Sequence, residues 1–214
     1  MSKKVGILGS GVVAKALATG FKQHGYQVMV GSRSPEKLAD WAREQGVEVG
    51  DFAQTAAFGE IVVLAVAGTA AEPALALAGK QNLAGKVVID TTNPISEDDA
   101  DRGVLRYFTG PNESLMERLQ KAHPEAHFVK AFNSVGNAFM VNPQFAGGPP
   151  TMFICGNDAG AKGTVGEILT RFGWAHEDAG FAESARPIEA LCQLWCARGF
   201  LQNQWAHAFQ LLKA

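Results

Sequence analysis

Two glycines and an alanine near the start of the chain have the spacing that binds phosphate groups. The stretch VGILGSGVVAKAL places Gly9, Gly11 and Ala14 in the pattern Gly-x-Gly-x-x-Ala, after an apolar run and before a helix-like segment. Gly9 allows a tight turn, and Gly11 lets backbone N–H groups approach a pyrophosphate at the positive end of the helix. Ala14 is small enough for close packing of helix on strand. The loop predicts a dinucleotide site, with a turn that only packs as the alternative.

The segment GSRSPEK, residues 31–37, indicates which dinucleotide this is. At the end of the second strand of such a fold, an acid accepts a hydrogen bond from a free ribose 2′-hydroxyl, whereas a 2′-phosphate requires cations and donors. This chain has Ser32, Arg33, Ser34 and Lys37 there, and no acid before Glu36. The pattern favours NADP(H) over NAD(H). The alternative is that Arg33 is an ordinary solvated residue.

No group of residues suggests acid–base catalysis, so the catalytic residue stays unassigned. His24 falls at an expected helix end, where a positive imidazole suits the helix dipole. His127 and Lys130 flank an expected strand, where a role at the surface or behind the site is more typical than catalysis. This agrees with hydride transfer to a flavin-like ring, in which the protein positions two planar rings about 3–3.5 Å apart and excludes water.

Cys192 and Cys196 are four residues apart, a spacing that could hold two metal ligands on a helix. They also lie in an apolar stripe with Ile188, Leu191 and Trp195, and no nearby cluster supplies two more ligands. We therefore expect buried thiols and no metal. Three cysteines in 214 residues suit the reducing cytoplasm better than a disulfide framework.

Composition and charge exclude several classes of function. The residues are 47% hydrophobic and 19% charged, and the formal net charge of −2 gives no reason to expect nucleic-acid or membrane-surface binding. The longest uncharged apolar run, residues 61–71, is too short for a membrane span, which needs roughly 20 residues. The start of the chain has no signal-peptide pattern, so we expect a cytoplasmic protein.

Strand-like and helix-like segments alternate along the chain. In the first expected helix, Val13, Leu17 and Phe21 fall on one face; the second has Ser34 as N-cap and Pro35 as its first residue, and ends before Gly46. Near-continuous apolar strands with helices between them predict an α/β fold with a doubly wound parallel sheet of the Rossmann type. The expected strands are residues 5–8, 28–30, 61–66, 87–89, 128–132 and 152–154.

The clearest break is NPQFAGGPPT, residues 142–151, because two glycines followed by two prolines cannot continue a helix or a central strand. We therefore divide the chain into a dinucleotide-binding domain, residues 1–148, and a small C-terminal part packed against it, residues 149–214. That part should hold one strand, a helix near residues 159–171 and an apolar helical tail. The tail has more apolar surface than a free terminus needs, which predicts a homodimer interface or a wall of the acceptor pocket besides core packing. Its large apolar residues are Trp195, Phe200, Leu201, Trp205, Phe209, Leu211 and Leu212.

With these motifs in place, the chain resembles the NADP-dependent oxidoreductases related to the deazaflavin (coenzyme F420) NADP reductases, and more distantly the reductase domains of the STEAP ferric reductases. The likeness covers nearly the whole chain. It rests on GILGSGVVAKAL, VGSRSPEKL, VVIDTTNPI, VKAFNSVGNAFMVNP, MFICGNDAGAK and EDAGFAESARPIE. The last three are the more specific, because a generic dinucleotide domain does not need them.

The resemblance implies three groups of NADP(H)-binding residues. The phosphates would be lined by Ser10, Gly11, Val12 and Val13. The 2′-phosphate would be held by Ser32, Arg33 and Lys37. The nicotinamide half would be approached by Val66, Ala70, Asn93 and Ala131. The loop Thr91-Thr92-Asn93-Pro94 and the Trp-rich tail depart from the deazaflavin enzymes, so the sequence does not name the hydride acceptor.

The leading hypothesis is therefore an NADPH-dependent oxidoreductase whose small planar acceptor is a flavin, a deazaflavin or a similar molecule. A 3-hydroxyacid or imine-type dehydrogenase is the second hypothesis. Such enzymes have a longer helical domain after the dinucleotide fold, and Lys162 and Lys213 lack the setting of their catalytic lysine. The third is a module that senses NADP(H) without turnover.

Overall fold

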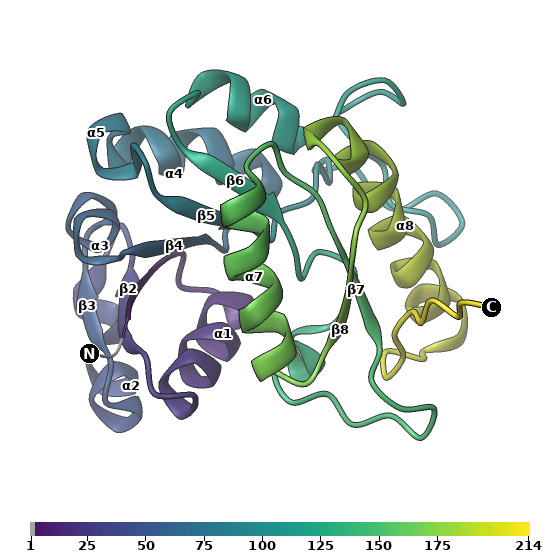
Figure 1. Ribbon diagram of the computed structural model, residues 1–214, viewed down its shortest axis with the longest axis horizontal. Coiled ribbons are helices and arrows are strands. Elements are labelled where there is room, and N and C mark those ends of the chain that lie inside the picture. Colours follow the sequence, from purple (N-terminus) through teal and green to yellow (C-terminus); the bar gives the residue numbers. More distant parts are fainter. Residues whose placement is uncertain (1–2) are drawn as a thin grey trace.

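The computed structural model describes residues 3–214, which form a parallel sheet covered by helices on both faces (Figure 1). Its six strands lie in the order β3-β2-β1-β4-β5-β6. They are β1 (Lys4–Leu8), β2 (Gln27–Gly31), β3 (Glu48–Gly50), β4 (Ile61–Leu64), β5 (Val87–Asp90) and β6 (His127–Lys130). The strand order reverses between β1 and β4, so the loops after these strands diverge and leave a crevice at the carboxyl edge. The expected doubly wound fold is confirmed.

The two faces of the sheet bury separate hydrophobic clusters. On one face pack α1 (Val12–Gln23), α2 (Ala39–Gln45) and α7 (Ala159–Arg171), with Leu17 and Phe21 of α1 buried as the helical pattern predicts. On the other face pack α3 (Phe52–Phe58), α4 (Ala71–Ala78), α6 (Leu115–Ala122) and the start of α8 (Ala185–Gln202), with the short α5 (Lys80–Leu83) beside them. The helices packed on both faces of the sheet hold the carboxyl ends of the strands in fixed positions.

The second helix differs from the prediction at its start. The segment begins with a 3-10 turn, Pro35–Leu38, and α2 follows only at Ala39. Ser34 precedes the turn but its side chain caps nothing. The predicted end is right, because Gly46 closes α2 in the left-handed conformation (φ 63°).

Two short strands were not predicted. β3 has three residues, and β8 (Ala175–Asp178) is polar and largely exposed. β8 pairs in parallel with β7 (Thr151–Ile154), the strand that was predicted beyond the glycine–proline break. Residues from both sides of this break share one hydrophobic cluster; for example, Phe21 lies edge-on to Phe172.

The prediction of a helical tail is correct as far as Gln202 and wrong for the residues after it. α8 ends at Asn203, which adopts a left-handed backbone (φ 50°), and residues 203–214 turn back without helical structure. Thr151 at the start of β7 donates its N–H to the carbonyl of Phe209 at 2.8 Å. Short 3-10 turns complete the fold at Gly68–Ala70, Asn137–Phe139 and Ala182–Ser184.

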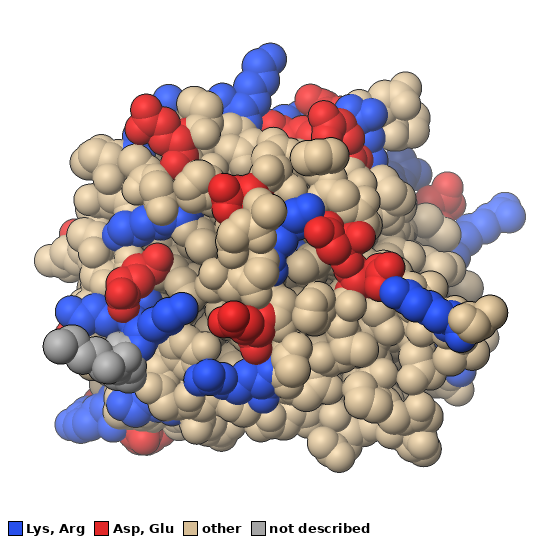
Figure 2. All heavy atoms as spheres, viewed as in Figure 1, with Lys and Arg blue, Asp and Glu red and all other residues tan. Residues whose placement is uncertain are grey.

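Within residues 3–214, no helix is both long and apolar enough to cross a membrane. Figure 2 shows acidic and basic side chains interspersed over one face of the molecule, without a field of a single sign.

Candidate functional site

The glycine loop between β1 and α1 passes very close to the neighbouring strand. Gly9 has φ 134°, and a Cβ atom there would overlap the backbone of Ala65, the residue after β4. The Gly9 N–H donates to the carbonyl of Gly31 at the end of β2, at 3.0 Å. Glycine at this position therefore lets the turn lie directly over the crevice between β1 and β4.

The first turn of α1 is open to an anion. Gly11 is the N-cap residue and has no side chain to bond the free N–H groups of the turn. A helix leaves its first N–H groups unsatisfied, and together with the dipole they favour a phosphate at this end. A Cβ atom on Gly11 would meet nothing within 4 Å, so the space above it is open.

A cavity of about 460 Å³ starts at this loop and runs along the ends of β1, β2 and β4. It brings together eight of the twelve predicted cofactor-binding residues: Gly9, Ser10, Gly11, Ser32, Arg33, Lys37, Val66 and Ala70. Ser34, Phe52, Pro73, Ala74 and Leu77 complete much of its wall. The lining contains no carboxylate, imidazole or thiol, so its only ionisable side chains are two cations.

Those cations, Arg33 and Lys37, stand exposed at one end of the cavity. Neither forms an ion pair within the described part of the chain, although Arg43 on α2 does pair with Asp40. Ser32 is almost buried; its hydroxyl accepts the N–H of Ser34, and its own N–H donates to the carbonyl of Gly50 at 3.0 Å. The unpredicted strand β3 thus fixes the backbone that carries the cations.

The other predicted residues lie outside this cavity. Val12 is 68% exposed and lies on another face of α1, while Val13 packs against the core. Asn93 lies in the loop after β5, half-buried. Ala131 is completely buried after β6.

Gly68 and Asn93 bring two of these loops together. A Cβ atom on Gly68 would overlap the carbonyl oxygen of Asn93, so the loop after β4 lies directly against the loop after β5. Asn93 donates its side-chain amide to the carbonyl of Asn133 at 2.8 Å, and Asn133 returns a bond to the Asn93 side chain at 3.0 Å. Loops from three successive strands are therefore joined at the carboxyl edge of the sheet.

Beneath these loops lies a buried ion cluster that the sequence did not reveal. Lys130 was expected at the surface or behind the site, and its side chain is completely buried between Asp90 at 2.7 Å and Glu189 at 2.8 Å. Burial lowers the pKa of this ammonium group, but the two carboxylates outweigh burial and hold the pKa above its ordinary value. The available signal was a lysine inside an apolar strand, next to a strand that ends in aspartate.

The two cysteines of α8 lie side by side, with Cys192 buried, Cys196 half-buried and their sulfur atoms 3.9 Å apart. No group of three or more His, Cys, Asp or Glu residues suited to a metal ion occurs among residues 3–214. The two histidines considered above do not line the cavity at the glycine loop. His24 bonds to Asn142 at 3.0 Å, and His127 faces Asp158 at 3.8 Å.

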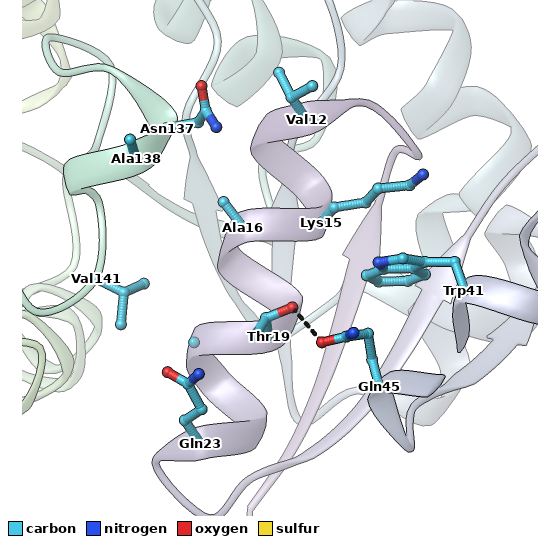
Figure 3. A pocket seen from close by; sticks show the side chains of 11 residues that line it. Val12, Lys15, Ala16, Thr19, Gln23, Trp41, Gln45, Asn137, Ala138 and Val141 are labelled. Carbon is cyan, nitrogen blue, oxygen red and sulfur yellow. Dashed lines mark hydrogen bonds between the residues drawn. The ribbon is translucent and has the colours of Figure 1, made fainter. Parts of the chain in front are cut away.

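A second groove of about 450 Å³ follows the outer face of α1 (Figure 3). In it the Lys15 ammonium lies over the Trp41 ring, and Thr19 bonds to Gln45 at 3.1 Å. Val12 lies at one end of this groove and Gln23 at the other. The groove contains neither the end of β2 nor Gly9, so it lacks the features that bind a dinucleotide.

Comparison with known proteins agrees with this geometry. Residues 4–94 match the family model described as NADP oxidoreductase, coenzyme F420-dependent. The crystal structure of a protein from Arthrobacter sp. FB24, provisionally assigned as an F420-dependent NADP reductase, is 31% identical and superposes with a TM-score of 0.92. Each of these two chains is covered completely by the other.

Other proteins match this chain over part of their own length or share its fold alone. Metalloreductase STEAP3 of Rattus norvegicus is 32% identical over 188 residues, which are 88% of this chain and 36% of that protein. The chain thus spans about a third of this relative. A reductive aminase from Aspergillus terreus, solved in complex with NADPH and ethyl levulinate, is 18% identical with a TM-score of 0.69. The superposition covers 95% of this chain and 64% of the aminase, and it shows a common fold.

Proposed function

This chain belongs to the family of coenzyme F420-dependent NADP oxidoreductases and is an NADP-dependent reductase; on that premise we propose that it transfers hydride between NADPH and a deazaflavin, a flavin or another small planar acceptor. The observation that carries the proposal is the cavity itself. It joins an uncapped helix N-terminus to two unpaired cations, and its lining contains no carboxylate, imidazole or thiol. Such a lining suits binding and positioning rather than proton transfer.

In the proposed binding mode, the pyrophosphate lies at the first turn of α1, and Ser10 and Gly11 face it together with the backbone N–H groups of Val12 and Val13. Arg33 and Lys37 contact the 2′-phosphate, with Ser32 as a further donor. Charge-assisted bonds of this kind are roughly twice as strong as neutral ones. Because the described residues give these cations no carboxylate, binding would break no existing ion pair.

The nicotinamide half would extend from the phosphates towards Val66, Ala70 and Asn93. Ala131 would support this part from below, since it is completely buried. When bound, NADPH would supply a hydride, a hydrogen with two electrons, and would become NADP⁺, while the acceptor ring would take up the hydride and a proton. The protein's part is to hold the two rings at about 3–3.5 Å and to exclude water.

Two hypotheses from the sequence compete with this proposal. A 3-hydroxyacid dehydrogenase needs a lysine free to act as acid or base, but Lys162 pairs with Asp178 and Lys213 with Glu177. The imine-reducing neighbours share only the fold. Family membership favours turnover over a module that senses NADP(H), and measured turnover would separate the two.

Three further expectations remain proposals: a division of the chain at residue 148, a cytoplasmic location and a homodimer without nucleic-acid partners. The dimer proposal is supported by Phe200 and Leu201 at the end of α8 and by Trp205 just after it, which are at least 39% exposed. Sedimentation equilibrium of the purified chain tests it, and a monomer at micromolar concentration would contradict it.

The decisive experiment for the function is an NADPH-oxidation assay at 340 nm with separate acceptors: oxidised F420, FMN, a ferric chelate and a quinone. Calorimetric titration with NADPH accompanies it. We expect binding of NADPH and turnover with the deazaflavin or FMN. A folded protein that does not bind NADPH would refute the proposal.

A further inference from the structure

The loop after β5 is anchored from below by the buried side chain of Lys130. The Lys130 ammonium group donates to the backbone carbonyl of Thr92 at 2.8 Å, in addition to its two ion pairs. Asp90 accepts the N–H of Thr92 at 2.9 Å and its hydroxyl at 2.7 Å. Lys130 and Asp90 therefore hold the peptide groups on both sides of Thr92 directly before Asn93.

The same cluster is connected to α8 and α6. Glu189 on α8 accepts hydrogen bonds from the N–H groups of Leu115 and Met116, at 3.0 and 3.1 Å, and pairs with Lys130. One carboxylate thus caps α6 and neutralises the lysine. α8 also supplies the carbonyl of Ile188, which accepts from Asn133 at 2.9 Å. Neutralising the two carboxylates would not require Lys130 to donate a hydrogen bond to the loop after β5 as well.

Phe132 shows that the neighbouring loop after β6 is held in an unusual conformation. It adopts φ 62°, in the left-handed region that is strained for a bulky residue, and it is almost completely buried. This turn places Asn133 where it reaches Asn93. The surroundings must offset the strain, and the ion cluster lies at the base of this loop.

We propose that Lys130 is a positioning residue for the nicotinamide half of the cofactor site, acting through the Thr92 carbonyl and Asn93. This inference rests on the proposed function. It assigns to Lys130 no contact with the cofactor and no proton transfer. The adenosine half, at Arg33 and Lys37, lies at the ends of other strands and does not depend on the cluster.

The test compares two probes on the whole chain: NADPH, and 2′,5′-ADP, which carries the same 2′-phosphate and lacks the nicotinamide. The main variant is Lys130→Met combined with Glu189→Gln. It removes one positive and one negative charge, so the net charge of the cluster is unchanged, and the glutamine oxygen can still accept from Leu115. We expect the Kd for NADPH to rise at least fivefold, while the Kd for 2′,5′-ADP changes less than twofold. The fluorescence of the bound reduced nicotinamide should shift towards that of free NADPH.

Lys130→Arg provides a second variant, which keeps the positive charge but replaces the compact ammonium group by a larger planar guanidinium, and should show a smaller change in the same direction. The control is Lys162→Met with Asp178→Asn, which removes an ion pair of 2.8 Å between α7 and the end of β8. It should lower the melting temperature and leave both affinities unchanged.

Equal losses for both probes would mean a general loss of structure and would overturn the inference, as would wild-type affinities and fluorescence in the folded Lys130 variants. If the double variant does not fold, the Lys130→Arg result decides alone: no change in NADPH fluorescence or affinity refutes the positioning role. A folded wild-type protein that binds neither probe would refute the proposed function itself, and the inference with it.

Discussion

A Cβ atom on Gly9 would overlap the carbonyl oxygen of Ala65, whereas a Cβ atom on Gly11, two residues later, would stand in open space. Gly9 also has a backbone conformation (φ 134°) that other residues rarely adopt, and Gly11 (φ −77°) does not. The two glycines of one motif therefore differ: the fold requires a glycine at position 9, whereas the space above Gly11 is open.

The first prediction follows from this difference. Gly11→Val should keep the wild-type melting temperature and abolish NADPH binding, because its side chain would occupy the place of the pyrophosphate. Gly9→Ala should lower the melting temperature, because the turn must move away from β4. Thermal unfolding and calorimetry measure both effects. Normal NADPH binding by Gly11→Val would show that the loop is only a packing turn.

The second prediction concerns the choice of cofactor. The protein should bind NADPH at least about ten times more tightly than NADH, a difference of about 1.4 kcal/mol. Arg33→Asp should abolish or reverse this preference, because it places a negative charge beside the 2′-phosphate. Arg43→Ala, which removes an exposed arginine outside the cavity, is the matched control and should leave the preference unchanged. Equal affinities of the wild-type protein in calorimetric titration would refute the assignment.

The third prediction concerns acid stability. Arg186 on α8 bonds both carboxylate oxygens of Glu117 on α6, at 2.6 and 2.9 Å, and this holds the pKa of Glu117 below its ordinary 4.5. A lowered pKa means that the unfolded chain takes up the proton first as the pH falls. The contribution is therefore complete well above pH 4.5 and is lost progressively as the pH falls from there through the lower pKa of the folded protein. Because the pair is partly exposed and screened by solvent, Arg186→Ala should lower the stability only modestly at pH 7.

Urea unfolding at pH 7 and pH 3.5 measures this effect, and the difference between wild type and Arg186→Ala should shrink at the lower pH. Arg118→Ala, which removes the exposed pair with Glu113, is the comparison for a surface ion pair. A difference that is the same at both pH values would show that Arg186 stabilises by packing.

The fourth prediction concerns the C-terminal segment. His207 stacks on the Trp195 ring with centroids 4.9 Å apart, and Trp195 donates its indole N–H to the His207 carbonyl at 2.8 Å. Deleting residues 203–214 should lower the melting temperature by roughly 4–8 °C, as expected for a loss of about 2 kcal/mol in a domain of this size. NADPH binding should persist, since the segment does not line the cavity at the glycine loop. Turnover should fall if the segment borders the acceptor.

Removing only Lys213 and Ala214 is the control, because it breaks one exposed ion pair with Glu177. Sedimentation of the longer deletion shows whether a dimer is lost with it. A truncated protein with wild-type stability, oligomeric state and turnover would contradict every role for the segment.

The strands and helices that were predicted correctly are those whose pattern of apolar residues follows from their burial in the fold. Val5–Leu8 and Val28–Val30 are apolar because both faces of the sheet are covered, and the glycine loop has a fixed backbone requirement. These signals are local, so they can be recognised without the fold. Eight of the cofactor residues predicted from the glycine loop, the end of the second strand and the family resemblance line one cavity.

The missed elements depend on partners that are distant in sequence. The β8 residues are polar and exposed, and they form a strand because β7 lies beside them. Lys130 is buried because Asp90 and Glu189 reach it from 40 and 59 residues away, and no local pattern specifies such a meeting. Trp205 was predicted to continue α8, but the chain reverses and the ring packs on Gly199 instead.

The contact between Thr151 and Phe209 also limits how this protein can associate. The chain end lies along the edge of β7 that β8 leaves free, where it accepts the Thr151 N–H and donates the N–H of Leu211 to the Thr151 hydroxyl at 3.0 Å. An uncovered strand edge is a template for pairing with another chain. Removal of residues 209–214 would therefore free the N–H of Thr151 at the start of this strand edge for pairing with another chain. Phe209 and Leu211 thus protect the start of β7 from pairing with another chain.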